Sequence, residues 1–250
     1  MGPYSLLIDY IRTLISLSML GYASYKDIKT REINDMVWII SAGAGLIFDI
    51  YELHVGEITL QGTIISIGFM AVLSGVLLYL SLFGEADLIA FITLAILHPR
   101  TPLYNYIGYP PIFFSFTIIA NTAIAGLLMA FYTFSINIVE DLSGKNLFER
   151  YKDISGLRKI ALLFTGRYKS LKELRGPPFE YPLEVNGKVI IKPDLFDDHE
   201  ANKAFRVLRE RGLSYVWVSS TIPYIVVLMV GYVISVLFGD LMFTIMSMLV

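Results

Sequence analysis

The sequence predicts an α-helical integral membrane protein with six transmembrane helices and a small cytoplasmic α+β insertion before the last helix. Of its 250 residues, 55% are hydrophobic and only 17% are charged. Two uncharged runs, residues 58–83 and 110–139, are 26 and 30 residues long, whereas a spanning helix needs about 20 apolar residues. Most of the charge is concentrated in residues 140–215, which hold 15 basic and 12 acidic side chains. Apolar segments and a polar insertion are therefore separate parts of the chain.

The predicted spans are residues 5–24, 36–53, 58–83, 88 to near or beyond 97, 111–139 and 216–238. None alternates apolar and polar residues over about ten positions, as the strands of a membrane barrel do. In lipid, the backbone hydrogen bonds must then close within each segment, so the spans are predicted to be helices. The first is expected to be retained, because no small-residue cleavage site follows it. Its Asp9 and Arg12 lie one turn apart, and we expect them to pair.

The distribution of lysine and arginine predicts the orientation. Lys26, Lys29 and Arg31 follow the first span, and 15 of the 20 basic residues lie between positions 145 and 211. With six spans both groups fall on one side, which the positive-inside rule makes the cytoplasm. We therefore expect a multi-pass protein of the cell membrane, with external termini and with the segments around Asp27 and Asp87 facing the cytoplasm.

The polar insertion divides the chain into three predicted parts: residues 1–139, the cytoplasmic domain 140–215, and the last helix with its tail, 216–250. Residues 183–191 alternate around Asn186 and Gly187, a pair typical of a two-residue hairpin turn because both positions need positive φ. We expect a small sheet there. This part of the chain is interpreted either as an ordinary packed insertion, which we favour, or as one that provides a docking surface near a site.

Two aspartates lie at the boundaries of apolar segments. Asp27 ends the first of them, and Asp87 closes the run Gly84, Glu85, Ala86, Asp87 between two others. Ionisable groups retained beside hydrocarbon usually face a cavity or a partner and mark function. Asp27 alone is also typical of a cytoplasmic loop residue, and Asp87 alone of a first-turn acid stabilised by the helix dipole. Taken together, on one side of the membrane, they favour an acid–base pair.

Several other chemistries are excluded or disfavoured. The chain has no cysteine, which excludes disulfides, thiolate catalysis and cysteine-ligated zinc. Its three histidines, His54, His98 and His199, have no metal-ligand spacing. No phosphate-binding or dinucleotide-binding loop occurs, so we expect neither a metal nor a cofactor. The basic residues are expected to contact the headgroups of the lipid bilayer rather than nucleic acid.

The residues around the two aspartates form two short patterns. Asp27 is followed four positions later by Arg31 and then by Ile33 and Asn34, and Asp87 closes the second pattern. These patterns resemble the two motifs of the archaeal preflagellin and prepilin peptidases, relatives of bacterial type IV prepilin peptidases among the GxGD aspartyl proteases. Six spans with a polar insertion before the last complete the resemblance.

The resemblance implies roles for individual residues. Asp27 and Asp87 would be the catalytic aspartates, and Gly84 and Ala86 would set the geometry of the site loop, although Ala86 stands where the family usually has glycine. Arg31 is interpreted either as a contact of Asp27 or of an acidic group of the substrate, or equally as an ordinary basic anchor on the cytoplasmic side. The remaining nearby acids are expected to be solvated: Glu32, Asp35 and Glu85.

The resemblance also implies the reaction. Two carboxylates would hydrolyse a peptide bond without a covalent intermediate, removing the short basic signal peptide of membrane-anchored archaellin or pilin precursors on the cytoplasmic side. The chain lacks the cysteine-rich loop of the bacterial relatives, so it is expected to act as a protease only. Because Asp27 ends a helix and Asp87 begins one, we expect Asp27 to carry the shared proton and Asp87 to start as the base.

Two other functions are considered beside the peptidase. In an ion-coupled transporter, both aspartates would bind an ion, but the chain has no internal repeat of the kind that such carriers show. In a non-enzymatic membrane scaffold, the cytoplasmic domain would recruit partners. Processing of a precursor by the purified protein distinguishes all three.

Overall fold

The computed structural model describes residues 4–80, 83–151, 154–185, 188–190, 197–221 and 223–249. The chain divides into two compact units, Met1–Gly126 together with Pro223–Val250, and Leu127–Ile222. The first unit contains α1 (Ser5–Thr30), α2 (Met36–His54), α3 (Leu60–Tyr79), α4 (Glu85–Leu97), α8 (Tyr224–Leu237) and α9 (Leu241–Leu249). Helix α5 (Phe114–Glu140) begins in the first unit and ends in the second.

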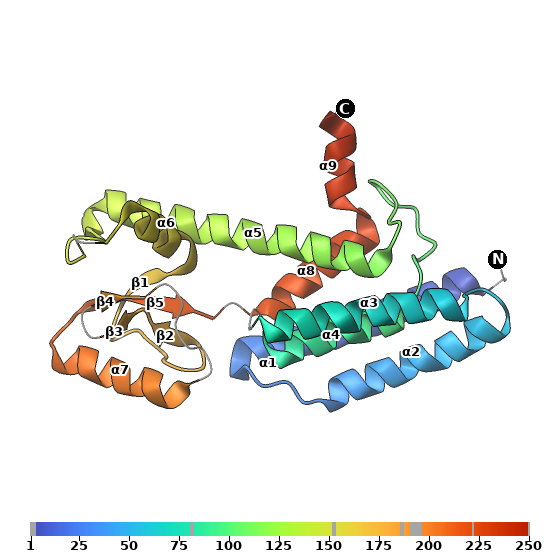
Figure 1. The fold of residues 1–250 in the computed structure, drawn as a ribbon, viewed down its shortest axis with the longest axis horizontal. Helices are drawn as coiled ribbons and strands as arrows, with labels where there is room; N and C mark the ends of the chain where they lie inside the picture. Colours follow the sequence, from blue (N-terminus) through green and yellow to red (C-terminus); the bar gives the residue numbers. More distant parts are fainter. Residues whose placement is uncertain are drawn as a thin grey trace. The chain divides into compact units, whose positions relative to one another are not determined.

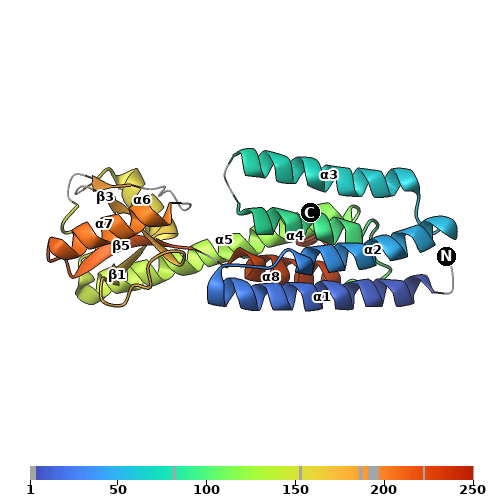
Figure 2. The same cartoon turned by 90° about the horizontal axis from the view of Figure 1, so that it is seen from below.

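Helix α4 is the central element of the first unit. It packs between α2 and α3, while α1 packs against α2 and α8 (Figures 1 and 2). Its sequence is apolar all round, which is typical of a buried helix. Phe91 and Leu94 of α4 are almost completely buried, and they share one core with Leu20 of α1 and Tyr232 of α8. The helix that forms this core therefore carries Asp87, one of the two candidate residues, in its first turn.

Four helices are long and apolar enough to cross a membrane. They are α1, α2, α3, and α5 together with the following π-helix η1 (Asp141–Lys145). Helices α4 and α8 have 13 and 14 residues, about 20 Å each at 1.5 Å per residue, against a hydrocarbon thickness of ~30 Å. Four of the six predicted spans are thus helices of sufficient length and apolar character, and the other two are shorter helices.

The prediction that the last span begins at residue 216 is wrong. Tyr215–Ser220 is strand β5, and α8 begins only at Tyr224, after Pro223. Val216, Trp217 and Val218 are buried in the second unit, where β5 pairs with a strand on each side. Residues of these types favour strands because they pack well on a pleated, half-buried surface. Their hydrophobicity reflects the core of a small domain and not contact with lipid.

The second unit has the predicted mixture of helix and sheet. Helices α6 (Gly156–Thr165) and α7 (Asp198–Glu210) accompany an antiparallel sheet of order β1 (Arg167–Ser170), β5, β2 (Glu180–Pro182). The predicted hairpin strands are present as β3 (Glu184–Val185) and β4 (Lys188–Val189), with Glu184 opposite Val189. The turn residues Asn186 and Gly187 lie outside the described residues.

Candidate functional site

The two aspartates lie near each other in the first unit. Asp27 is in the last turn of α1, and Asp87 is in the first turn of α4. The ends of α1, α4 and α8 meet at one end of the helical unit (Figures 1 and 2). Asp27 interacts electrostatically with Asp87. Two carboxylates that are 60 positions apart in the sequence therefore share one site.

Asp27 is held by a cation and by a helix N-terminus. Its Oδ1 accepts a hydrogen bond from Nη1 of Arg31 at 3.0 Å, and its Oδ2 accepts one from the backbone N–H of Ile225 at 3.3 Å. Ile225 lies in the first turn of α8, where unpaired N–H groups and the helix dipole favour a negative charge. Of the alternatives that the sequence left open for Arg31, the structure shows the contact with Asp27, and a backbone N–H of α8 supplies the second donor.

Arg31 reaches Asp27 because of the way in which α1 ends. Arg31 is the C-cap residue and has a left-handed backbone, with φ 60° and ψ 14°. A residue in this conformation commonly terminates a helix. Asp27 and Arg31 are four positions apart, so their ion pair forms locally, at the C-terminal end of α1. Arg31 also interacts electrostatically with Asp87, which places one cation beside both carboxylates.

Asp87 has a more apolar environment. Its Oδ2 accepts a hydrogen bond from the backbone N–H of Gly84 at 3.2 Å. Nearby, the rings of Phe83 and Tyr224 make an edge contact at 4.6 Å between centroids, and Phe91 packs against both rings. Tyr224 interacts electrostatically with Asp87. Three aromatic side chains thus line this side of the site.

The backbone of residues 84–87 explains why an alanine fits at position 86. Ala86 lies inside α4, and the non-glycine residues with positive φ in the described part of the chain are Arg31 and Asn146. The half-buried side chain of Ala86 packs against the core of the first unit. Gly84 is extended, with φ −72° and ψ 157°, and a Cβ there would lie 3.4 Å from Oδ2 of Asp87. No glycine-specific conformation is required at either position.

Some site residues have no signal in the sequence. Phe83, Tyr224 and the backbone of Ile225 contact the site, but Tyr224 and Ile225 lie more than 130 positions after Asp87. Only the fold brings them together. The acids Glu32, Asp35 and Glu85 are exposed, as predicted. Across the described residues, no group of three histidine, aspartate or glutamate side chains is arranged to hold a metal ion.

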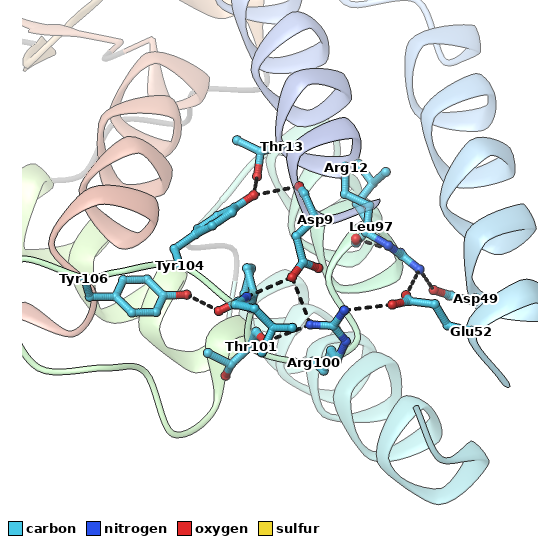
Figure 3. Close-up of polar contacts among 12 residues, drawn as sticks. Asp9, Arg12, Thr13, Asp49, Glu52, Leu97, Arg100, Thr101, Tyr104 and Tyr106 are labelled. Atoms are coloured by element: carbon cyan, nitrogen blue, oxygen red, sulfur yellow. Dashed lines mark hydrogen bonds and ion pairs between the residues drawn. The ribbon is translucent and has the colours of Figure 1, made fainter. Parts of the chain in front are cut away.

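A second cluster of charged residues lies in the same unit, and it corrects the predicted pair of Asp9 and Arg12 (Figure 3). Asp9 pairs with Arg100 at 3.0 Å, whereas Arg12 pairs with Asp49 at 2.8 Å and Glu52 at 2.6 Å. The prediction is wrong because each residue finds a partner on another element. One helical turn of spacing allows a pair but does not enforce it.

Comparison with known proteins relates the chain to a family of peptidases. The model of the type IV leader peptidase family matches residues 14–136, which include both aspartates and Arg31. The model of the archaeal peptidase A24 C-terminus, type II, matches residues 158–241. The chain is also similar to a preflagellin peptidase of Methanococcus voltae, at 24% identity over 234 residues that cover 90% of this chain and 94% of the relative. The two family matches together span most of the sequence, and the chain belongs to the type IV leader peptidase family, in its archaeal branch.

Proposed function

We propose that the chain is an aspartic endopeptidase that removes the leader peptide of archaellin or type IV pilin-like precursors, with Asp27 and Asp87 as its catalytic pair. Family membership makes the chain a leader peptidase. The aspartic mechanism rests on one observation: two carboxylates from the ends of different helices share a site with a single arginine. Such a site provides both an acid and a base for hydrolysis.

The proposed mechanism uses one proton shared by the pair. Two nearby carboxylates resist double ionisation, so one is protonated while the other is charged. The ionised aspartate takes a proton from water, and the water oxygen attacks the scissile carbonyl carbon. The protonated aspartate donates a hydrogen bond to the carbonyl oxygen. Collapse of the tetrahedral intermediate breaks the C–N bond, and a carboxyl proton passes to the leaving amine.

The contacts favour Asp27 as the base and Asp87 as the acid. Asp27 accepts hydrogen bonds from Arg31 and from the N-terminus of α8, and both favour its charged form. Asp87 lies beside the rings of Phe83 and Tyr224. The roles of acid and base expected from the sequence were the reverse. That expectation rested on the dipoles of α1 and α4, because the position of α8 could not be predicted. The titration itself belongs to the pair.

The proposed topology keeps six spans and a cytoplasmic site. In it, α4 and α8 also cross the bilayer, and their shortness is accommodated either by thinning of the bilayer around them or by recession of their ends from its surface. The basic residues of the second unit and of the segment after α1 lie on the cytoplasmic side. A precursor anchored by its own apolar helix would then present its basic leader at the same surface as Asp27 and Asp87.

Processing of a precursor by the purified full chain in proteoliposomes tests the function. Asp27→Asn and Asp87→Asn should each abolish cleavage while the protein remains folded in the membrane, because each removes a group that the reaction requires. Glu85→Gln is the matched control, since Glu85 is an exposed acid in the same turn as Asp87, and it should cleave at the wild-type rate. Substantial cleavage by either aspartate variant would refute the proposed site.

A further inference from the structure

The charged cluster around Arg12 joins three helices at the end of α4 remote from Asp87 (Figure 3). Arg12 of α1 is 1% exposed. Its Nη1 donates to the backbone oxygen of Leu97 at 2.8 Å, and its Nη2 donates to Asp49 and Glu52 of α2. Glu52 also accepts a hydrogen bond from Arg100 at 2.8 Å. One guanidinium group thus binds the last residue of α4 and two carboxylates of α2.

This cluster is not needed for the proposed chemistry. Leu97 is ten positions after Asp87 on α4, a rise of about 15 Å, and Arg12 is fifteen positions before Asp27 on α1, about 22 Å. The cluster and the aspartate pair are therefore at opposite ends of the same two helices. Charges buried among apolar helices are costly and are retained where they are paired and serve a purpose.

The cluster does have a geometric consequence for α1 and α4. Among the described residues, the hydrogen bonds from α1 to α4 and its C-cap lie at this end, from Arg12 to Leu97 and Ile96, and between Ser16 and His98. In lipid, the hydrophobic effect does not hold apolar helix faces together, and interhelical hydrogen bonds and packing set their association. A helix is stiff over its length, so a fixed point at one end sets the axial position of the other.

We propose that Arg12 is a positioning residue that fixes the axial register of α1 against α4 and thereby the separation of Asp27 and Asp87. The inference rests on the proposed function for its catalytic consequence but not for its geometric one. Arg12 suits this role because its planar guanidinium binds a helix C-terminal carbonyl and two carboxylates at once. A cation at the last carbonyls of α4 is also favoured by the helix dipole.

The register is measurable without any substrate. The chain has no cysteine, so spin labels at Lys29→Cys and Glu85→Cys, both exposed positions near the pair, report the distance between the ends of α1 and α4. The test variant is Arg12→Met combined with Asp49→Asn. It removes one guanidinium and one carboxylate, so the net charge of the buried cluster is unchanged. Asp49→Asn alone is the matched control, because it keeps the bond from Arg12 to Leu97.

We expect the double variant in nanodiscs to show a shifted or broadened distance distribution, and the control to match the wild type. With unlabelled protein, kcat for leader cleavage should fall by about 10- to 100-fold, as displacements on the order of 1 Å can cause, with KM within about twofold. Arg12→Lys keeps a cation at Leu97 and should recover part of kcat. If the double variant does not fold, Arg12→Lys is the test variant, and it should show a smaller change of the same kind, because an ammonium group lacks the planar fork that binds the carbonyl and both carboxylates at once.

A folded double variant with the wild-type distance distribution would overturn the proposal. So would a control variant with the same change as the double variant. If the wild-type protein cleaves no leader at all, the proposed function fails, but the distance measurement still decides whether Arg12 sets the register.

Discussion

At the residue scale, the site is asymmetric because Arg31 pairs with only one of the two carboxylates. Arg31 binds Asp27 at 3.0 Å, and its charge also acts on Asp87. In Arg31→Gln, the charged form of the pair loses its nearby cation, so the acidic limb of the pH–rate profile should move to higher pH. Arg31→Lys should keep the limb close to that of the wild type. An unchanged limb in Arg31→Gln, measured as kcat/KM from pH 4 to 9, would show that Arg31 does not act on the pair.

The residues of the site loop give a second test at this scale. Ala86→Gly should remain active, because Ala86 has ordinary helical geometry and a glycine in a helix is only about 1 kcal/mol less favourable than an alanine. Gly84→Ala should be tolerated, because its Cβ would lie 3.4 Å from Oδ2 of Asp87, an ordinary contact. Gly84→Val should lower cleavage, because its two methyl groups extend beyond that Cβ and would crowd the carboxylate. Equal activity of Gly84→Val and the wild type would exclude the close approach.

Some of the site residues could be predicted from the local sequence, and others could not. Asp27 and Asp87 were predictable because a charge beside hydrocarbon is costly and because short motifs surround both. The contact of Arg31 with Asp27 was one of the alternatives that the sequence left open, since a spacing of four allows a pair but does not enforce it. Tyr224 was not, since its contact with Phe83 depends on how two distant helix ends meet. The partners of Asp9 and Arg12 were likewise set by packing among helices.

At the element scale, apolar runs located the helices but did not separate lipid-facing from core residues. The run 58–83 contains α3, and the run 110–139 contains nearly all of α5. Residues 215–218 are also apolar, but they belong to a strand, because their partners β1 and β2 lie in the polar insertion. Hydropathy reports that a segment avoids water, and only the neighbouring elements decide what it packs against.

The second unit allows a pH test of one of its buried contacts. Tyr151 donates a hydrogen bond to Glu184, which also pairs with Arg150 at 2.7 Å. Burial, and then the hydrogen bond to Glu184, raise the pKa of Tyr151. The folded state thus favours the neutral phenol, so this contribution to stability is complete below the unfolded pKa of about 10 and is lost as the pH rises above it.

We therefore expect the unit to lose stability above pH 10, and Tyr151→Phe to lose less over the same range. Trp217 lies in this unit and Trp38 lies in the other. The fluorescence of Trp217 during thermal unfolding, in a Trp38→Phe background, measures the effect in the full chain. Identical pH dependence in Tyr151→Phe and in the parent would show that Tyr151 does not titrate in this way.

At the scale of the whole molecule, the shortness of α4 bears on where the site lies in the bilayer. Its 13 residues span about 20 Å, less than the ~30 Å of hydrocarbon. Asp87 would then be recessed from the cytoplasmic surface, or the bilayer would be thinned around the helix. Recession requires the substrate to enter the membrane in an unwound form.

Single cysteines at positions 84–87 distinguish these possibilities in the naturally cysteine-free chain. In the recessed arrangement, an impermeant thiol reagent added from the cytoplasmic side should label them more slowly than Lys145→Cys, whose native side chain is 43% exposed. Rapid and uniform labelling at all four positions would place the site at the surface.

The central claim is that Asp27 and Asp87 act as one catalytic unit, and a double-mutant cycle tests it most directly. Single-turnover cleavage of a precursor is measured for the wild type, Asp27→Asn, Asp87→Asn and the double variant, with helicity and membrane insertion verified for each. Residues that act as a unit are strongly non-additive, so each single variant should lose on the order of 10³-fold or more, and the double variant should lose no more than either. Losses that multiply in the double variant, or a single variant that cleaves at a rate near that of the wild type, would contradict the account.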